Sequence, residues 1–273
     1  VVNTNATTYL FEEVVELDAE AKNGFTVTWY TSFDVSTGVG SGEVTSVTMG
    51  AAAANVYVVF ARVGYTLNVV AYTQNADGEY EENATGGDFS ATASGAENKY
   101  LHGSVITLTA ASSQGFEAAV WYTSFDASTG VGTDEVTSVT IDAADETVYV
   151  VFTREIYNLT IDSTALNGGV VVSGAINNTE NVYSVRYGKT VTLAITLNAG
   201  YDELTLVING ETKLDKEVTV SEQAPISSAR TYEYAYEVNG ETTVVVSAVA
   251  QEVSYTVYVG IQNIGADKIL KIH

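Results

Sequence analysis

The amino-acid sequence predicts an all-β protein of three tandem small β modules, in which the first module is incomplete and is completed by a C-terminal strand. Short runs rich in Val, Thr and Tyr alternate between apolar and polar residues, and Gly, Asn and Asp bound them. One long segment occurs twice with few changes, and a more divergent third copy follows it. The last residues form a strand-like segment of the kind that opens the complete copies.

The repeat is clearest in two segments that begin with Trp-Tyr-Thr. Residues 29–60 and 121–152 are identical at 24 of 32 positions, at an offset of 92 residues. Each complete copy opens with a strand-like lead, Tyr-Thr-Leu-Asn-Val at residues 65–69 and Tyr-Asn-Leu-Thr-Ile at residues 157–161. The third copy carries Tyr-Gly-Lys-Thr-Val-Thr-Leu at residues 187–193, which matches the stretch around residues 100–108.

These boundaries divide the chain into five segments. We expect an N-terminal extension (residues 1–8), an incomplete first module (9–62), a second module (63–154), a third module (155–251) and a C-terminal donor segment (252–273). Each module is expected to hold about six strands around a sandwich-like or β-grasp-like core. Residues 16–23 are long enough for one or two helical turns.

The order of motifs within a copy resembles a known repeat family. Gly-Phe, Trp-Tyr-Thr, Val-Thr-Ser-Val-Thr, an acidic or Ala-rich turn and Val-Tyr-Val-Val-Phe follow one another, which is similar to the Listeria–Bacteroides (internalin B-type) surface repeat. The resemblance covers nearly the whole chain and is most specific in the two copies with Trp-Tyr-Thr, because the third copy lacks the Trp. It implies small β modules in bacterial or archaeal surface proteins that act as spacers or interaction units, and it implies no activity.

Composition narrows the classes of function. With 11 Lys and Arg against 34 Asp and Glu, the formal net charge is −23, which repels nucleic acid and anionic membrane surfaces. No apolar run approaches the roughly 20 residues that a membrane-spanning helix needs. The absence of Cys excludes disulfides and thiolate metal sites. The sequence starts without Met and without a basic or apolar leader, which suits a mature secreted chain at the cell surface or outside the cell, although a shortened chain would start in the same way.

The sequence offers little for catalysis, and we predict that the protein is not an enzyme and has no cofactor. Its two histidines, His102 and His273, are not in a metal-ligand spacing, and no nucleophile or phosphate-loop motif is present. Trp29 and Trp121 recur at equivalent positions. We therefore interpret them as core anchors whose indole N–H finds an internal partner, rather than as platforms for sugar rings.

Two surface features remain as candidates. Asp77, Glu79 and Glu81 alternate around a glycine turn as calcium ligands do, but the twelve-residue pattern is incomplete, so a solvated hairpin turn is the favoured alternative. Four Asn-X-Thr sequons are candidate sites for surface glycans, whose attachment depends on the host. They lie at Asn5, Asn83, Asn158 and Asn177.

A module without its opening strand leaves an apolar groove and a bare sheet edge. The acceptor groove is expected at Val14, Val15, Leu17, Val56, Val58 and Phe60. The donor strand is expected to use Tyr255, Val257, Val259 and Ile261. Residues 1–8 are a candidate second, reciprocal strand.

The donor segment can close on its own chain or enter another copy. Three modules in series favour exchange between copies, and such head-to-tail contacts propagate into filaments. The sequence therefore predicts a structural subunit of an extracellular filament, polymerising with identical subunits by donor-strand complementation. The alternative is a spacer or ligand-binding segment of a cell-surface adhesin, in which neighbouring repeats complete the ends.

Overall fold

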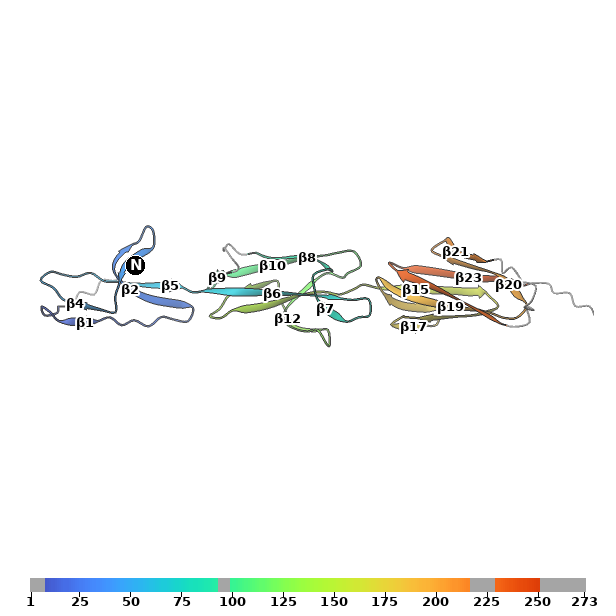
Figure 1. Ribbon diagram of the computed structural model, residues 1–273, viewed down its shortest axis with the longest axis horizontal. Helices are drawn as coiled ribbons and strands as arrows, with labels where there is room; N and C mark the ends of the chain where they lie inside the picture. The colour runs from blue at the N-terminus through green and yellow to red at the C-terminus, as the bar shows by residue number, and fades with distance from the viewer. Residues whose placement is uncertain (1–7, 93–98, 217–228, 251–273) are drawn as a thin grey trace, which may run out of the picture. The chain divides into compact units, whose positions relative to one another are not determined.

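The chain is all-β, as the sequence predicts. The computed structural model describes residues 8–92, 99–216 and 229–250, in which strands form several small sheets and no helix occurs (Figure 1). The chain divides into two compact units, with the boundary between Glu155 and Ile156. The first unit contains the first and second modules, and the second unit contains the third.

The second module has a complete pair of sheets around one core. Its described strands are β6 (Gly64–Gln74), β7 (Tyr80–Glu82), β8 (Gly87–Thr92), β9 (Lys99–Leu101), β10 (Val105–Ser112), β11 (Val120–Asp126), β12 (Val131–Glu135), β13 (Ser138–Thr140) and β14 (Glu146–Phe152). One sheet has the order β12-β11-β14-β6-β7, with β9 also on β6, and the other has the order β13-β10-β8. The lead strand β6 runs parallel to the last strand β14, from the pair Leu67–Glu146 to the pair Thr73–Phe152.

Side chains from both sheets meet in the core of the second module. Inward residues of β10 are buried while their neighbours are exposed, which is the two-residue period of a strand with one buried face. Trp121 is buried and meets the ring of Phe89 edge-on, with 5.9 Å between ring centroids. Trp121 is thus a core anchor, but its indole N–H finds no hydrogen-bond partner among the described residues, so the expected internal partner was wrong.

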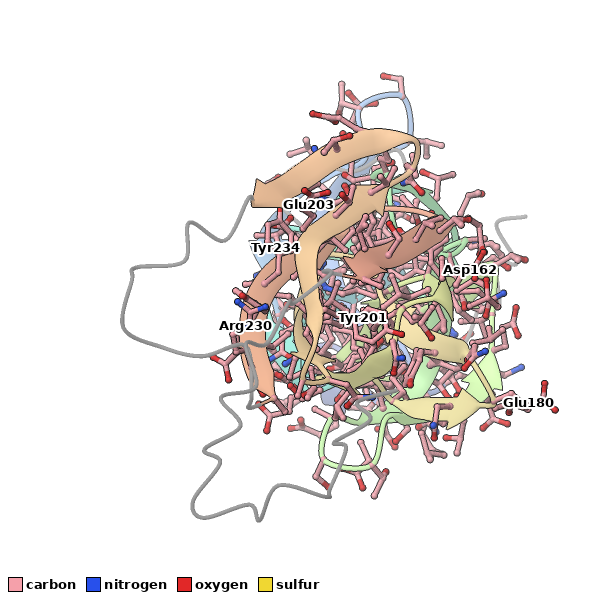
Figure 2. All side chains as sticks on the ribbon, turned by 90° about the vertical axis from the view of Figure 1, so that its right-hand side faces the viewer. Asp162, Glu180, Tyr201, Glu203, Arg230 and Tyr234 are labelled. Carbon is pink, nitrogen blue, oxygen red and sulfur yellow. The ribbon has the colours of Figure 1, made fainter. Side chains whose placement is uncertain are left out.

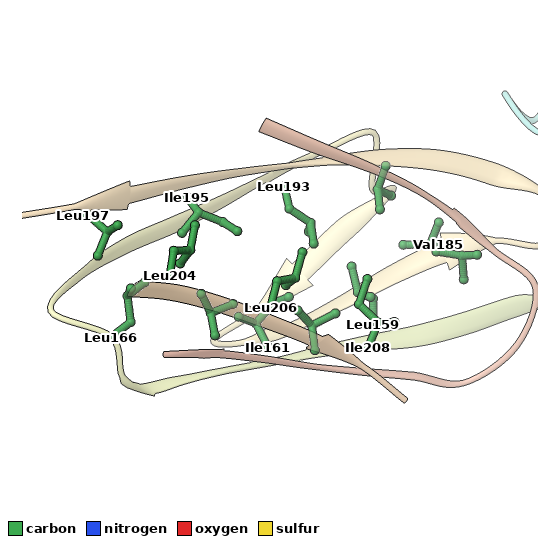
Figure 3. Packing of buried hydrophobic residues seen from close by; sticks show 14 residues of the cluster. Leu159, Ile161, Leu166, Val185, Leu193, Ile195, Leu197, Leu204, Leu206 and Ile208 are labelled. Atoms are coloured by element: carbon green, nitrogen blue, oxygen red, sulfur yellow. The ribbon is translucent and has the colours of Figure 1, made fainter. Parts of the chain in front are cut away.

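The third module repeats this arrangement in the second unit. Its described strands are β15 (Ile156–Ala165), β16 (Gly168–Ser173), β17 (Asn177–Thr179), β18 (Val182–Arg186), β19 (Lys189–Leu197), β20 (Tyr201–Ile208), β21 (Glu211–Lys216), β22 (Arg230–Val238) and β23 (Thr242–Ala250). The sheets have the orders β17-β18-β15-β23-β20-β21 and β16-β19-β22, and the lead strand β15 again runs parallel to the last strand β23. Leucine, isoleucine and valine side chains fill the space between the sheets (Figure 3).

The structure makes the alignment of the third module with the second specific. Tyr100 lies opposite the lead residue Tyr65, and it is Val185 that lies opposite the corresponding lead residue Tyr157. Tyr187 therefore occupies the position of His102, and not that of a residue in β9. The matching hydrogen bonds of the following glycines, described below, support the same alignment.

The first module contains only part of this arrangement. Its described strands are β1 (Val14–Glu16), β2 (Phe25–Asp34), β3 (Val39–Glu43), β4 (Ser46–Thr48) and β5 (Tyr57–Arg62). The sheets are β1-β4 and β3-β2-β5, which correspond to β10-β13 and β12-β11-β14 of the second module. Residues 17–22 are extended or irregular rather than helical, so the helical turn expected over residues 16–23 was wrong.

The β2–β3 and β11–β12 hairpins are held by the same Asp-X-Ser-Thr-Gly turn. The Asp126 carboxylate accepts hydrogen bonds from the backbone N–H and the hydroxyl of Ser128, at 2.9 and 2.7 Å. Asp34 accepts the same two bonds from Ser36. Because these donors favour the charged form, they hold the pKa of both carboxyls below the ordinary value of 3.8.

We predict that Ser128→Ala raises the pKa of Asp126 toward its ordinary value and leaves the pKa of Asp34 low, because each turn has its own serine. A carboxyl whose pKa is lowered by folding stabilises the folded state at pH values above its ordinary pKa. That stability is lost as the pH falls through the folded-state pKa. Carboxylate carbon shifts followed by NMR through an acid titration measure both groups in one experiment. An unchanged pKa of Asp126 would contradict the assignment of the hydroxyl as its main donor.

Candidate strand-exchange site

Two strand edges that are covered in the second module are open in the first. In the second module, β6 pairs with the outer edge of β14, and β8 pairs with the outer edge of β10. Within the described residues, β5 is the last strand of its sheet and β1 pairs with β4 alone. The first module therefore presents bare backbone N–H and C=O groups along both strands.

The apolar residues beside these edges are exposed in the first module and buried in the second. Residues 56–60 and 148–152 have the same sequence, Val-Tyr-Val-Val-Phe. Val58 is 39% exposed and Phe60 is 48% exposed, whereas their counterparts Val150 and Phe152 are both fully buried at 0%. Since the two peptides are identical, the difference comes from the strands that cover them.

Other residues of the same inner face follow this pattern. Each of them is half-buried in the first module, while its counterpart in the second module is buried. They are Val15, Leu17, Trp29 and Val56, with the counterparts Ile106, Leu108, Trp121 and Val148. We call the inner-face residues Val15, Leu17, Trp29, Val56, Val58 and Phe60 the acceptor surface.

Val14 does not belong to the acceptor surface. It is 56% exposed, and its counterpart Val105 is 62% exposed even in the complete second module. Successive residues of a strand point to opposite faces, so Val14 lies on the outer face when Val15 lies on the inner one. Trp29, which the sequence predicted to be a core anchor, is only half-buried and belongs to the acceptor surface instead of Val14.

The second module indicates what a covering segment must provide. On β6, Leu67 is buried in the core, and Val69 and Ala71 pack against it at the alternate positions. Phe152 lies tightly against Gly86, where an added Cβ would come within 2.3 Å of the Phe152 Cβ. A covering segment therefore needs apolar residues at alternate positions and room beside the phenylalanine ring.

The expected donor residues Tyr255, Val257, Val259 and Ile261 lie outside the described residues, as do residues 1–7. The sequence of the donor segment nevertheless has the required alternation. Tyr-Thr-Val-Tyr-Val at residues 255–259 aligns with the lead Tyr-Thr-Leu-Asn-Val at residues 65–69. The donor assignment stays a prediction.

The turn that carries the calcium candidates is organised by Asn75. Its side-chain oxygen accepts hydrogen bonds from the backbone N–H groups of Asp77, Gly78 and Glu79, each at 3.0 Å. Its side-chain nitrogen donates to the Glu81 carboxylate at 2.9 Å. The described part of the chain contains no group of three acidic or histidine side chains suited to a metal ion, and calcium binding at Asp77, Glu79 and Glu81 stays a prediction.

The described sequons lie in exposed or half-exposed positions. The Asn83 side-chain oxygen accepts hydrogen bonds from the backbone N–H and hydroxyl of Thr85, while Asn158 and Asn177 are exposed on β15 and β17. Asn5 lies outside the described residues. Glycan attachment stays a prediction.

The chain matches no known protein family, no curated protein and no solved structure. The resemblance of its repeats to the Listeria–Bacteroides repeat therefore stays a prediction. A helix long and apolar enough to cross a membrane is not found among the described residues.

We predict that Phe152→Ala and Phe60→Ala have very different effects on the unassembled chain. Removing the buried Phe152 ring leaves a cavity and costs about 3–5 kcal/mol. Removing the half-exposed Phe60 ring costs about 1 kcal/mol or less, because water already reaches it. Urea unfolding of dilute protein measures both, and equal losses would contradict an open acceptor surface in the single chain.

Proposed function

We propose that the protein is a structural subunit of an extracellular filament, in which the donor segment of one copy completes the first module of another. The observation that carries the proposal is the open acceptor surface, because the same pentapeptide is buried in the second module and half-exposed in the first. A covering strand would pair the bare edge of β5 and bury Val58 and Phe60. Burial of each large apolar side chain is worth about 1.5–3 kcal/mol.

The second module supplies the register of the proposed exchange. The β6–β14 pairing transfers to the first module by the repeat offset of 92 residues, and to the donor segment by the offset between Tyr65 and Tyr255. Val259 then lies opposite Val56 of the acceptor copy, and Ile261 lies opposite Val58. The donor strand runs parallel to β5, as β6 runs parallel to β14.

The charge of the chain bears on what holds copies together. Each copy carries a formal net charge of −23, so copies repel one another at long range. The proposed contact therefore depends on backbone pairing and apolar burial. Both are short-range interactions that strand addition supplies along the full length of an edge.

The adhesin alternative uses the same open edge. In that case a neighbouring repeat of a longer polypeptide supplies the covering strand, and separate copies have no reason to join. The two functions therefore differ in whether the strand that covers β5 comes from the donor segment of another copy.

We predict that deletion of all residues from Val253 onward gives a soluble protein that does not polymerise, because the donor residues are removed while the three modules remain. A chain that ends at Gly265 keeps Tyr255, Val257, Val259 and Ile261 and serves as the matched control. Electron microscopy and sedimentation of the purified proteins provide the measurement. Undiminished filaments from the longer deletion would refute strand donation by this segment.

We predict that a Val56→Cys copy and a Val259→Cys copy form a disulfide-linked pair when they are mixed and oxidised. The natural chain has no Cys, so no other disulfide competes. Tyr258→Cys is the matched control, because its side chain points to the opposite face of the strand. Crosslinking only within the double variant Val56→Cys/Val259→Cys would indicate closure on the same chain, and no crosslink in either case would favour the adhesin alternative.

A further inference from the structure

At the joint between the first and second modules, the ring of His102 packs against Gly24. Gly24 has a positive φ of 80°, and a Cβ added to it would lie only 2.2 Å from Cγ of His102. The His102 ring meets the ring of Phe25 edge-on, with 5.6 Å between centroids. Val63 links the two modules, since its N–H donates to the Gly24 carbonyl and its carbonyl accepts from the His102 N–H, both at 2.9 Å.

Both halves of this joint recur in every module. The half that receives the ring, which we call the seat, is a glycine with positive φ followed by an aromatic residue. The seats are Gly24-Phe25, Gly115-Phe116 and Gly200-Tyr201, with glycine φ values of 80°, 83° and 87°. The half that supplies the ring, which we call the plug, is an aromatic residue at the start of the smaller sheet.

The plugs are identified by a shared backbone bond. The residue after each plug has a positive φ, and its N–H donates to a carbonyl at or just after the end of the strand that pairs with the next strand of the chain. The plugs are Phe11, His102 and Tyr187. The N–H of Glu12 donates to the Met49 carbonyl at 2.8 Å, that of Gly103 to the Ile141 carbonyl at 2.7 Å, and that of Gly188 to the Val238 carbonyl at 2.7 Å. In the second module β10 separates His102 from Gly115, so plug and seat lie at opposite ends of a module.

Phe11 and the Gly200 seat are open, in contrast to the joint of His102 with Gly24. Phe11 is 66% exposed, although it occupies the position of the well-packed His102. At Gly200 an added Cβ would meet no described atom within 4 Å, in contrast to Gly24. Figure 2 looks onto the end of the second unit where Tyr201 and Arg230 lie.

We propose that Phe11 of one copy packs on the Gly200-Tyr201 seat of another copy, so that the joint between copies repeats the joint between the first two modules. This inference rests on the proposed function, because strand donation brings the two sites together. The donor segment follows the third module as β6 follows the first, so a donor that enters a neighbouring copy carries its own seat toward Phe11 of that copy.

Charged residues lie beside both sites. Glu12 is an exposed carboxylate directly beside Phe11. On the seat side, the Arg230 guanidinium donates a hydrogen bond to the Tyr201 carbonyl. Asp202 and Glu203 follow Tyr201, and Glu13 follows Glu12, so acidic residues outnumber Arg230 at the contact, and the proposed contact depends on aromatic packing rather than on charge.

The test measures the critical concentration for filament assembly in variants of Phe11 in the full chain. Phe11→Ala is expected to raise it roughly tenfold, because an edge-on aromatic contact and its buried area are lost. Phe11→His, which installs the residue of the internal joint, is expected to stay within about threefold of the unchanged protein. Val35→Ala is the matched control, since Val35 is 76% exposed and its counterpart in the second module is Ala127.

The disulfide between Val56→Cys and Val259→Cys separates failure of this inference from failure of the proposed function. If that disulfide forms between copies and Phe11→Ala assembles as readily as the unchanged protein, the plug-and-seat joint is overturned while strand exchange stands. If the disulfide does not form between copies that carry Phe11, the filament proposal fails and the joint fails with it. A rise for Phe11→Ala that Phe11→His does not show supports both.

Discussion

The parallel pairing of the first strand of a module with its last strand is the constraint on which the fold depends. In the second and third modules this pairing joins β6 to β14 and β15 to β23. The core cannot close until both strands are present, because the last strand is covered only when the lead strand lies beside it. The first module contains the counterpart of β14 without a described counterpart of β6, so Val58 and Phe60 stay open to water.

Both proposals reuse contacts that the chain already makes within itself. Strand exchange would repeat the β6–β14 ladder, and the joint between copies would repeat the contact of His102 with Gly24 and Phe25. No new kind of interface is needed, since each proposed contact between copies corresponds to a contact that the structure shows within the chain. For the same reason, a substitution in an internal contact has a matched substitution at the proposed contact between copies.

The sequence predicted the all-β class, the repeat and the open inner face, because two nearly identical copies differ mainly in what precedes them. It did not predict the outer-face position of Val14, which depends on a register that strand pairing sets. It matched Tyr187 only to the stretch around residues 100–108, because the backbone bond of Gly188 that places Tyr187 at the position of His102 is visible only in the structure. It also underestimated the number of strands in the second and third modules, since short strands such as β7 and β9 have too few residues for a periodic pattern.

The parallel ladder between terminal strands has a mechanical consequence. The beginning of β6 and the end of β14 lie at opposite ends of their shared ladder, because paired parallel strands run in the same direction. Tension applied to a module through its two ends thus slides one strand along the other and loads all the ladder bonds at once. Peeling, in which bonds break one after another, would require the terminal strands to be antiparallel.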